Sequence, residues 1–201
     1  MKANNHRTAI VLGLAIACSP LSLFAGTSQP PQKKRTQVAV SAHQKKILAA
    51  FDRNVNDYLK QRERVKAQLP PLSKEATPEQ IDAYQKAFVE ALRAVRAGTK
   101  PGYIFNPEIA DYFRTIIKTE FPPTEKAEIR QTILEADTKG VPLKVNYPYP
   151  EAKELTQIPT KVLLKFPQLA KEVKYRFVGR HLLLVDTDNN LIVDYMLNAL
   201  P

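Results

Sequence analysis

Residues 173–196 read VKYRFVGRHLLLVDTDNNLIVDYM and contain three short runs of β-branched and aliphatic side chains. Each run has the length and composition of a β-strand. The runs are separated by Gly179-Arg180 and by Asp188-Asn189, residue pairs that favour tight hairpin turns. The pattern therefore predicts a three-stranded antiparallel meander near the end of the chain. Its strands are expected at Val173–Val178, Leu182–Asp186 and Leu191–Tyr195.

A long amphipathic helix is predicted upstream, from about Ser41 to the Pro70-Pro71 pair that stops it. Its apolar residues follow a heptad seam over three repeats, in which Arg62 is the one charged member. Such a seam fits either a coiled-coil dimer through this first helix or packing against other helices of the same chain. We favour packing within the chain, and therefore a monomer. The seam residues are Leu48, Phe51, Val55, Tyr58, Arg62, Val65 and Leu69.

Two further helices have recognisable start signals. Thr77 and Gln80 form a capping box around Pro78, and Asn106 precedes Pro107 at the next start. A fourth, shorter helix is expected from about Thr124 to Glu135. The fold class predicted from these elements is α+β, with an N-terminal array of three to four amphipathic helices followed by a small antiparallel β-meander. The expected apolar face of the second helix comprises Ile81, Tyr84, Phe88, Ala91 and Val95.

Between the helices and the meander, residues 141–147 alternate apolar with polar or proline side chains, which predicts an edge strand. The following Tyr147-Pro148-Tyr149-Pro150 is either a rigid link or a docking strip for another protein, and we favour the link. Residues 160–166 fit a short helix or a strand equally well. The chain is expected to divide into a signal peptide (1–25), a basic, proline-containing linker (26–45), a helical region (46–140) and a β-rich region (141–201). Whether the last two regions share one core is left open.

The signal peptide is predicted from a basic start, a short apolar middle and a small-residue exit. Its apolar run is shorter than the about 20 residues that a bilayer span requires. We expect cleavage between Ala25 and Gly26, and therefore an exported protein, periplasmic or secreted. Residues 15–18 offer a second possibility, because they resemble a lipoprotein box in which Cys18 would be lipidated.

The net charge of +10 is concentrated near the N-terminus. Residues 26–51 carry five basic side chains and no acidic one, whereas residues 52–201 carry 23 basic and 20 acidic side chains, a net of +3. This distribution argues against a nucleic-acid-binding domain. Any weak contact with an anionic surface is expected to involve the N-terminal basic side chains. These are Lys33, Lys34, Arg35, Lys45 and Lys46.

Motifs for catalysis or cofactor binding are not found, and we assign no catalytic or cofactor-binding residue. Beyond Cys18 there is no cysteine, and neither His43 nor His181 has a histidine four residues later, as a zinc-protease motif would require. Asp186, Asp188 and Asn190 place oxygen atoms at alternate positions, as calcium loops do, and are weak metal candidates. The calcium-loop pattern then fails, because leucines occupy the positions of the required glycine and glutamate. We favour a hairpin turn at this site. Asp194 lies in the last predicted strand, and we expect its side chain to face solvent.

Two stretches carry a family resemblance: EATPEQI at residues 75–81, with the later FNPE at 105–108, and YRFVGRHL at 175–182. The chain resembles uncharacterised exported bacterial proteins with an ATPEQ-type helix start and a YRFVGR-type C-terminal hairpin. The resemblance implies export and a similar fold over most of the mature chain, but no known activity. Thr-Pro-Glu-Gln starts also occur in periplasmic helical-hairpin stress chaperones, which lack a β-rich end, so we attribute that likeness to helix capping.

Together these observations predict an exported, non-enzymatic envelope or extracellular interaction protein. Its expected partner is another protein or an envelope polymer, and no nucleic acid. The alternative is a carboxylate-dependent hydrolase that acts on a cell-wall or carbohydrate polymer. Such an enzyme requires two carboxylates facing one cleft, about 5–10 Å apart.

Overall fold

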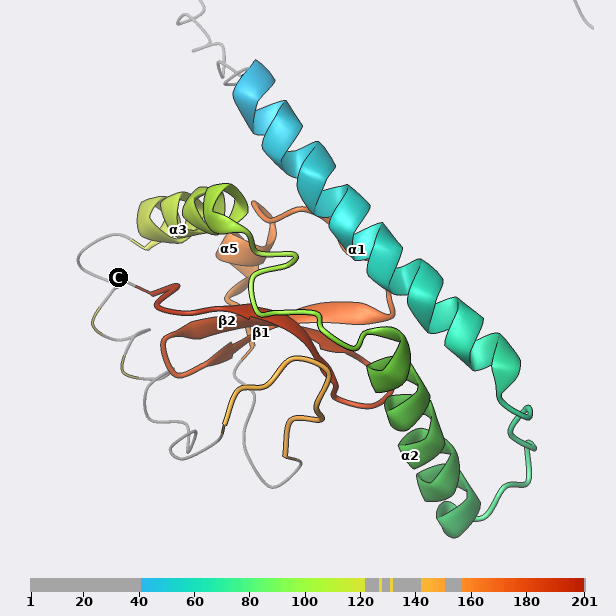
Figure 1. Ribbon diagram of the computed structural model, residues 1–201. Coiled ribbons are helices and arrows are strands. Elements are labelled where there is room, and N and C mark those ends of the chain that lie inside the picture. Colours follow the sequence, from blue (N-terminus) through green and yellow to red (C-terminus); the bar gives the residue numbers. More distant parts are fainter. Residues whose placement is uncertain (1–40, 122–126, 128–130, 132–141, 151–156, 201) are drawn as a thin grey trace, which may run out of the picture. The chain divides into compact units, whose positions relative to one another are not determined.

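A computed structural model describes residues 41–121, 127, 131, 142–150 and 157–200 (Figure 1). Among these residues, helices are followed by a three-stranded antiparallel sheet, which confirms the predicted α+β fold. The signal peptide, Cys18, the Ala25–Gly26 junction and most of the basic linker lie outside the described residues. The helices are α1 (Ala42–Gln68), α2 (Pro78–Val95), α3 (Pro107–Glu120) and α5 (Thr160–Leu163), and the strands are β1 (Val173–Val178), β2 (His181–Asp186) and β3 (Ile192–Met196).

Local sequence determines where the three long helices begin. The Ser41 and Thr77 hydroxyls each accept a hydrogen bond from the backbone of the glutamine three residues later, and that glutamine's side chain accepts one from the capping residue's backbone N–H. These capping boxes satisfy N–H groups that the first helical turn leaves free. Asn106 caps α3 by accepting from Ile109 N at 3.1 Å.

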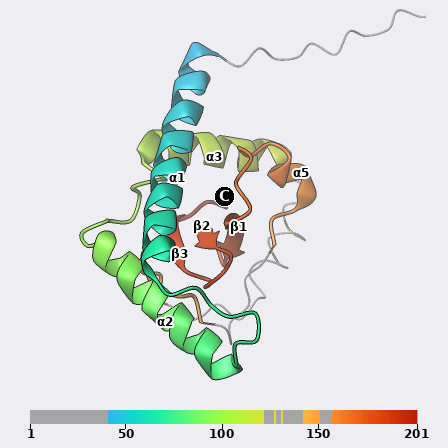
Figure 2. The ribbon, with the colours of Figure 1, turned by 90° about the vertical axis from the view of Figure 1, so that its right-hand side faces the viewer.

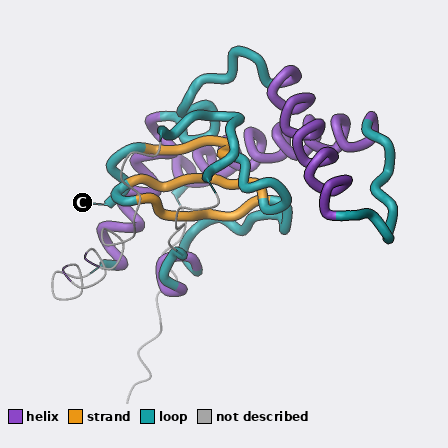
Figure 3. Tube along the Cα trace, turned by 90° about the horizontal axis from the view of Figure 1, so that it is seen from below, coloured by secondary structure: helices purple, strands orange, loops and turns teal. Residues whose placement is uncertain are grey.

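The three strands lie side by side in the order β1-β2-β3 (Figure 3). Val178 pairs with His181 around the Gly179-Arg180 turn, where Gly179 has a φ of +52°. In this left-handed region glycine avoids the steric cost that other residues incur. A bulge interrupts the β2–β3 register between Leu184 and Val185.

One hydrophobic core contains side chains from the helices and from one face of the sheet. Figure 2 shows α1, α2, α3 and α5 around the strands. At its centre, Phe113 of α3 lies 5.3 Å from Phe51 of α1 and 4.6 Å from Phe166, and Phe166 lies 5.0 Å from Tyr175 of β1, measured between ring centroids. A smaller cluster forms on the opposite face of the sheet, where Tyr149 packs against residues of all three strands.

Residues 142–147 do not form the predicted edge strand; they include a turn in which Asn146 has a φ of 65°. The segment nevertheless covers the outer edge of β3. Asn146 N donates to Ile192 O, and Ile192 N donates to Tyr147 O. An isolated bridge joins Pro148 to Leu191. The left-handed conformation of Asn146 interrupts the extended backbone that the alternating pattern predicted.

Two helical predictions are also refined. The buried residues of α2 are Phe88, Val89 and Leu92, whereas Ile81 and Val95, predicted on the apolar face, are exposed. Figure 1 shows the N-terminal end of α2, which contains Ile81, extending beyond the sheet. Within residues 160–166, the chain forms the short helix α5 rather than a strand. The predicted helix at Thr124–Glu135 lies outside the described residues, apart from Ala127 and Gln131.

Candidate functional site

Asp186 and Asp188, two of the three weak metal candidates, surround the guanidinium of Arg62. Arg62 Nε donates to Asp186 Oδ2 at 2.8 Å, and Nη2 donates to Asp188 Oδ2. Tyr58 Oη donates to the same Asp186 oxygen at 2.6 Å. Arg62, Asp186 and Tyr58 are all fully buried. The heptad position that Arg62 occupies in α1 therefore faces the β2–β3 turn.

The cation that Asp186 and Asp188 bind is the guanidinium of Arg62. Burial alone would lower the pKa of Arg62, but the adjacent Asp186 carboxylate raises it. Burial and then Asp186 raise the pKa of Tyr58, so its hydroxyl keeps the proton that it donates. Asn190, the third candidate, adopts a left-handed conformation in the turn and accepts from Tyr149 N through its carbonyl. Across the described ranges, no group of three or more histidine, cysteine or carboxylate side chains is placed to hold a metal ion.

A second buried network joins the end of α2 to the sheet. Arg96 Nε donates to Asn146 Oδ1 at 2.6 Å, and its Nη2 donates to the carbonyl of Val193 at 3.1 Å. The Arg96 guanidinium also lies 4.9 Å from the centre of the Tyr58 ring. Burial lowers the pKa of Arg96. The side chain thus connects α2, the 142–150 segment and β3.

Asp194 does not face solvent, so this expectation from the sequence is wrong. The side chain is buried, and its two oxygens accept hydrogen bonds from the backbone N–H groups of Gly102, Ile104, Phe105 and Tyr195 at 2.6–2.8 Å. Burial raises the pKa of Asp194, and these four hydrogen bonds oppose the rise. The carboxylate provides hydrogen-bond acceptors for backbone N–H groups of the loop before α3, which would otherwise be buried without partners.

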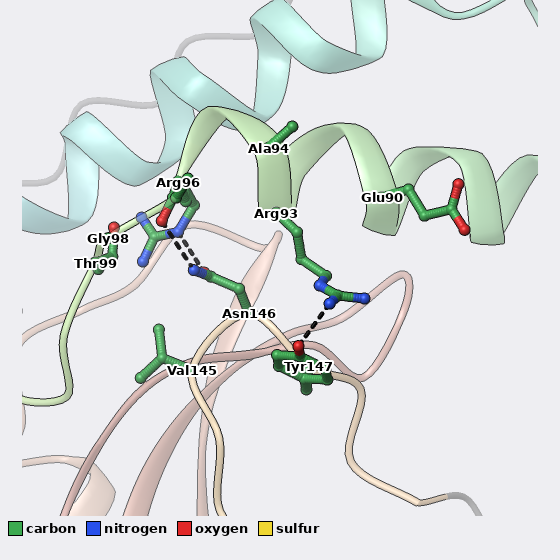
Figure 4. A pocket seen from close by; sticks show the side chains of 10 residues that line it. Glu90, Arg93, Ala94, Arg96, Gly98, Thr99, Val145, Asn146 and Tyr147 are labelled. Atoms are coloured by element: carbon green, nitrogen blue, oxygen red, sulfur yellow. Dashed lines mark hydrogen bonds between the residues drawn. The ribbon is translucent and has the colours of Figure 1, made fainter.

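A hollow of about 510 Å³ lies between the end of α2 and the 142–150 segment (Figure 4). In it Arg93 Nη2 donates to Tyr147 Oη at 2.6 Å, while Glu90 points away from this pair. The cationic groups of Arg93 and Lys144 each lie 3.9 Å from the centre of the Tyr147 ring. Hydrogen bonding to Lys144 and the nearby charge of Arg93 lower the pKa of Tyr147. These side chains are engaged with one another, and their contacts join α2 to Tyr147.

Tyr175, Arg176 and His181 lie close together in the sequence but do not form one site. Tyr175 and Arg176 are consecutive in a strand and therefore point to opposite faces. Tyr175 is buried and donates to Pro167 O at 3.1 Å. His181 Nδ1 accepts from Asn198 N at 3.1 Å, and burial and then Arg180 lower the pKa of His181.

A groove of about 470 Å³ with a largely apolar lining lies between α5 and β1. We call it the α5–β1 groove. Leu163 and Leu164 on its rim are 46% and 78% exposed, unusually high values for neighbouring leucines. The groove is lined by Gln157, Ile158, Leu163, Leu164, Phe166, Pro167, Gln168, Leu169, Val173, Lys174, Tyr175 and Arg176.

The groove runs alongside β1. Four consecutive residues, Val173–Arg176, line it. Since successive side chains of a strand point to opposite faces, a hollow that contacts all four lies alongside the strand rather than above one face. Unlike the outer edge of β3, the outer edge of β1 pairs with no other strand among the described residues.

Comparison of the chain with protein-family models, curated proteins and solved structures finds no match.

Two of the residues that line the groove, Lys174 and Arg176, are basic, and none of the lining residues is acidic. Residues 157–178 contain five basic side chains and one acidic one, Glu172. Burial lowers the pKa of Lys174 and of Arg176, and the charge of Arg176 lowers that of Lys174 further. The two cations are therefore less stable in their charged form than in free solution, and an anionic partner would favour them. The five basic residues are Lys161, Lys165, Lys171, Lys174 and Arg176.

Sequence reasoning missed the buried roles of Arg96, Asn146 and Asp194. One signal was present, because Asp194 stands inside an otherwise apolar strand, where an inward carboxylate must find donors. It also missed the groove, although KVLLK at residues 161–165 places apolar side chains between two lysines. Chemically, the groove offers apolar contact and positive charge, which are features of a binding surface.

Proposed function

We propose that this protein is an exported, non-enzymatic interaction protein that binds a protein of the cell envelope or extracellular space in the α5–β1 groove. The observation that carries the proposal is the pair of exposed leucines, Leu163 and Leu164, in the lining of the apolar α5–β1 groove. A contiguous apolar surface with a polar rim is typical of interaction sites.

Export is supported by the sequence pattern of residues 1–25. Among the described residues, no helix is long and apolar enough to cross a membrane. Intact-mass measurement of the protein recovered from exported fractions tests this part of the proposal. A mature chain beginning at Gly26 is expected; a diacylglyceryl mass on Cys18 would instead support lipidation, and an uncleaved chain in the cytoplasm would contradict export.

The non-enzymatic part is supported by how the two buried carboxylates are used. Asp186 is paired with Arg62 and Tyr58, and Asp194 is bound by backbone amides. Both carboxylates are engaged within the fold, whereas acid–base catalysis requires a carboxylate that reaches the substrate. Release of soluble sugars from purified cell wall by the mature protein would favour the hydrolase alternative.

The binding part is tested by a photo-crosslinking residue placed at Leu164 in the exported protein. A matched probe at Leu197, which is 50% exposed and does not line the groove, is the control. We expect a discrete adduct from position 164 and none from position 197. The captured protein must then bind the purified mature protein, and Leu164→Ser must weaken that binding while Leu197→Ser does not. Equal adducts from both positions would contradict the proposal.

A further inference from the structure

The accessible apolar surface of the α5–β1 groove lies mainly at the end of α5 and just after it. Leu163 and Leu164 are exposed, and Leu169 is half-buried. Phe166 and Tyr175 also line the groove, but they are buried and belong to the main core. A partner side chain that packs in the groove therefore gains most of its apolar contact from the two leucines, which it removes from water.

Positive charge surrounds this apolar surface. Lys174 and Arg176 line the groove, and its lining contains no acidic residue. Lys165, which is exposed, directly follows the two leucines in the chain. A partner that places an apolar side chain against the leucines thus brings its own neighbouring residues near cations.

The two cations of β1 remain available to an anionic partner. Within the described ranges, neither Lys174 nor Arg176 forms an ion pair with a carboxylate. Arg176 Nη1 donates to the carbonyl of Tyr175 at 2.8 Å, which uses one of the five N–H donors of the guanidinium. Because both side chains are half-buried, a carboxylate beside them is attracted more strongly than at a fully exposed surface.

We infer that the α5–β1 groove binds a protein segment in which a large apolar residue is flanked by acidic residues. This inference rests on the proposed function and specifies the partner's chemistry. The apolar residue packs against Leu163 and Leu164, and the carboxylates pair with Lys174 and Arg176. Since these cations are two residues apart in a strand, their Cα atoms lie about 7 Å apart, and two carboxylates at a similar separation contact both.

Charge and shape argue against two other occupants. A second copy that offered the same groove would bring like charges together, which destabilises an interface. An anionic bilayer matches the charge but presents a broad surface, whereas the groove is a hollow of about 470 Å³ whose lining includes the exposed amides of Gln157 and Gln168. Apolar hollows with polar surroundings are typical of protein interfaces that receive an anchor side chain.

The test uses the mature protein labelled with ¹⁵N and the capped peptide GEEFLEEG as the probe. One control peptide, GKKFLKKG, reverses the charge, and another, GEESSEEG, removes the apolar pair. We expect the probe to bind about tenfold or more tightly than either control. Amide shifts on binding should be concentrated at residues 163–169 and 173–176, and the affinity should fall as salt is added.

Charge reversal provides the matched protein variants. K174E/R176E is expected to bind GKKFLKKG more tightly than the acidic probe, with circular dichroism and thermal unfolding used to verify its fold. R64E/K66E changes the net charge equally at exposed positions of α1 and should retain the preference for the probe. Because the basic N-terminal segment is present in every variant, differences between the variants report on the groove.

The apolar contact is tested by Leu164→Ser, which should weaken binding of the probe several-fold, whereas Leu197→Ser should not. Equal affinity for all three peptides, amide shifts confined to other residues, or an equal loss in R64E/K66E would each overturn the inference. Vesicle binding or dimerisation that depends on Leu164, in a protein that does not bind the probe, would overturn it as well.

The two proposals fail separately. If position 164 still captures an envelope protein but the acidic probe does not bind, the inferred partner chemistry is wrong and the interaction function stands. If the probe binds as expected while no partner is captured from the exported protein, the groove has the inferred chemistry and the proposed function is wrong.

Discussion

Arg62 of α1 and Asp186 at the end of β2 are 124 residues apart in the sequence and form a fully buried ion pair, with Nε 2.8 Å from Oδ2. The pair joins the long helix to the β2–β3 turn. Tyr58 donates a further hydrogen bond to Asp186, and Arg62 donates further ones to Asp188 and Glu63. Removal of one partner from such a pair leaves a buried charge without compensation.

Arg62→Ala is therefore expected to lower the free energy of unfolding by about 3–5 kcal/mol. Urea denaturation followed by circular dichroism measures the loss. Arg64→Ala, at an exposed position two residues away on the same helix, should change the stability by about 0.5 kcal/mol or less. Similar small effects of both substitutions would show that the buried pair does not contribute to stability.

Asp194→Asn tests the carboxylate that binds the loop before α3. The amide retains the shape of the side chain but replaces one acceptor oxygen with an NH₂ group, which faces backbone donors. We expect a loss of about 2 kcal/mol or more, because buried N–H groups lose their acceptor. Amide exchange should also accelerate at Gly102 or Ile104, depending on which oxygen is replaced. Unchanged exchange at both would contradict this role.

Tyr147 should be among the first tyrosines to ionise in a spectrophotometric pH titration. Lys144 and Arg93 lower its pKa, whereas burial raises the pKa of Tyr58 and Tyr175. Tyr147→Phe should remove this early ionisation, and Lys144→Ala should move it to higher pH. Because the folded-state pKa is lowered, the contribution to stability develops as the pH rises through that pKa and is complete above about 10, the ordinary value. An early transition that persists in Tyr147→Phe would assign it to another tyrosine.

Leu184→Ala tests whether the sheet stabilises the whole fold. Leu184 is fully buried and belongs to the core that also contains residues of the helices. Truncation should cost about 2–5 kcal/mol and lower the melting temperature of the helical signal together with that of the sheet. Leu197→Ala, at a half-exposed position, is the control. Helices that melt at an unchanged temperature would show that the sheet is a separate unit.

The N-terminal basic residues are expected to carry any attraction to anionic surfaces. Co-sedimentation of the mature protein with phosphatidylglycerol vesicles should be weak and should decrease with salt, because the Debye length falls to about 8 Å at physiological ionic strength. Substitution of Lys33, Lys34, Arg35, Lys45 and Lys46 by Gln should abolish it. If the substituted protein still binds, the basic surface of the folded part is responsible, and K174E/R176E then tests the α5–β1 groove.

The sequence by itself determined the elements whose signals are local. Helix starts at Ser41, Thr77 and Asn106 depend on groups only three residues away, and the first hairpin turn depends on the pair Gly179-Arg180. The second turn is longer than the predicted pair, because it spans residues 187–190. The positions of the strands follow from runs of five or six residues that are rich in β-branched and aliphatic side chains. These interactions form within one segment, so no knowledge of distant residues is needed to predict them.

Only the tertiary structure decided which polar groups are buried and what surrounds them. Arg62 interrupts the heptad seam because its partners are in the β2–β3 turn, and Asp194 faces inward because a loop about 90 residues earlier presents its amides. The α5–β1 groove likewise depends on how α5 packs beside β1. Burial of charge and the formation of a groove depend on contacts between distant segments, and a sequence pattern of period two or 3.6 contains no information about those contacts.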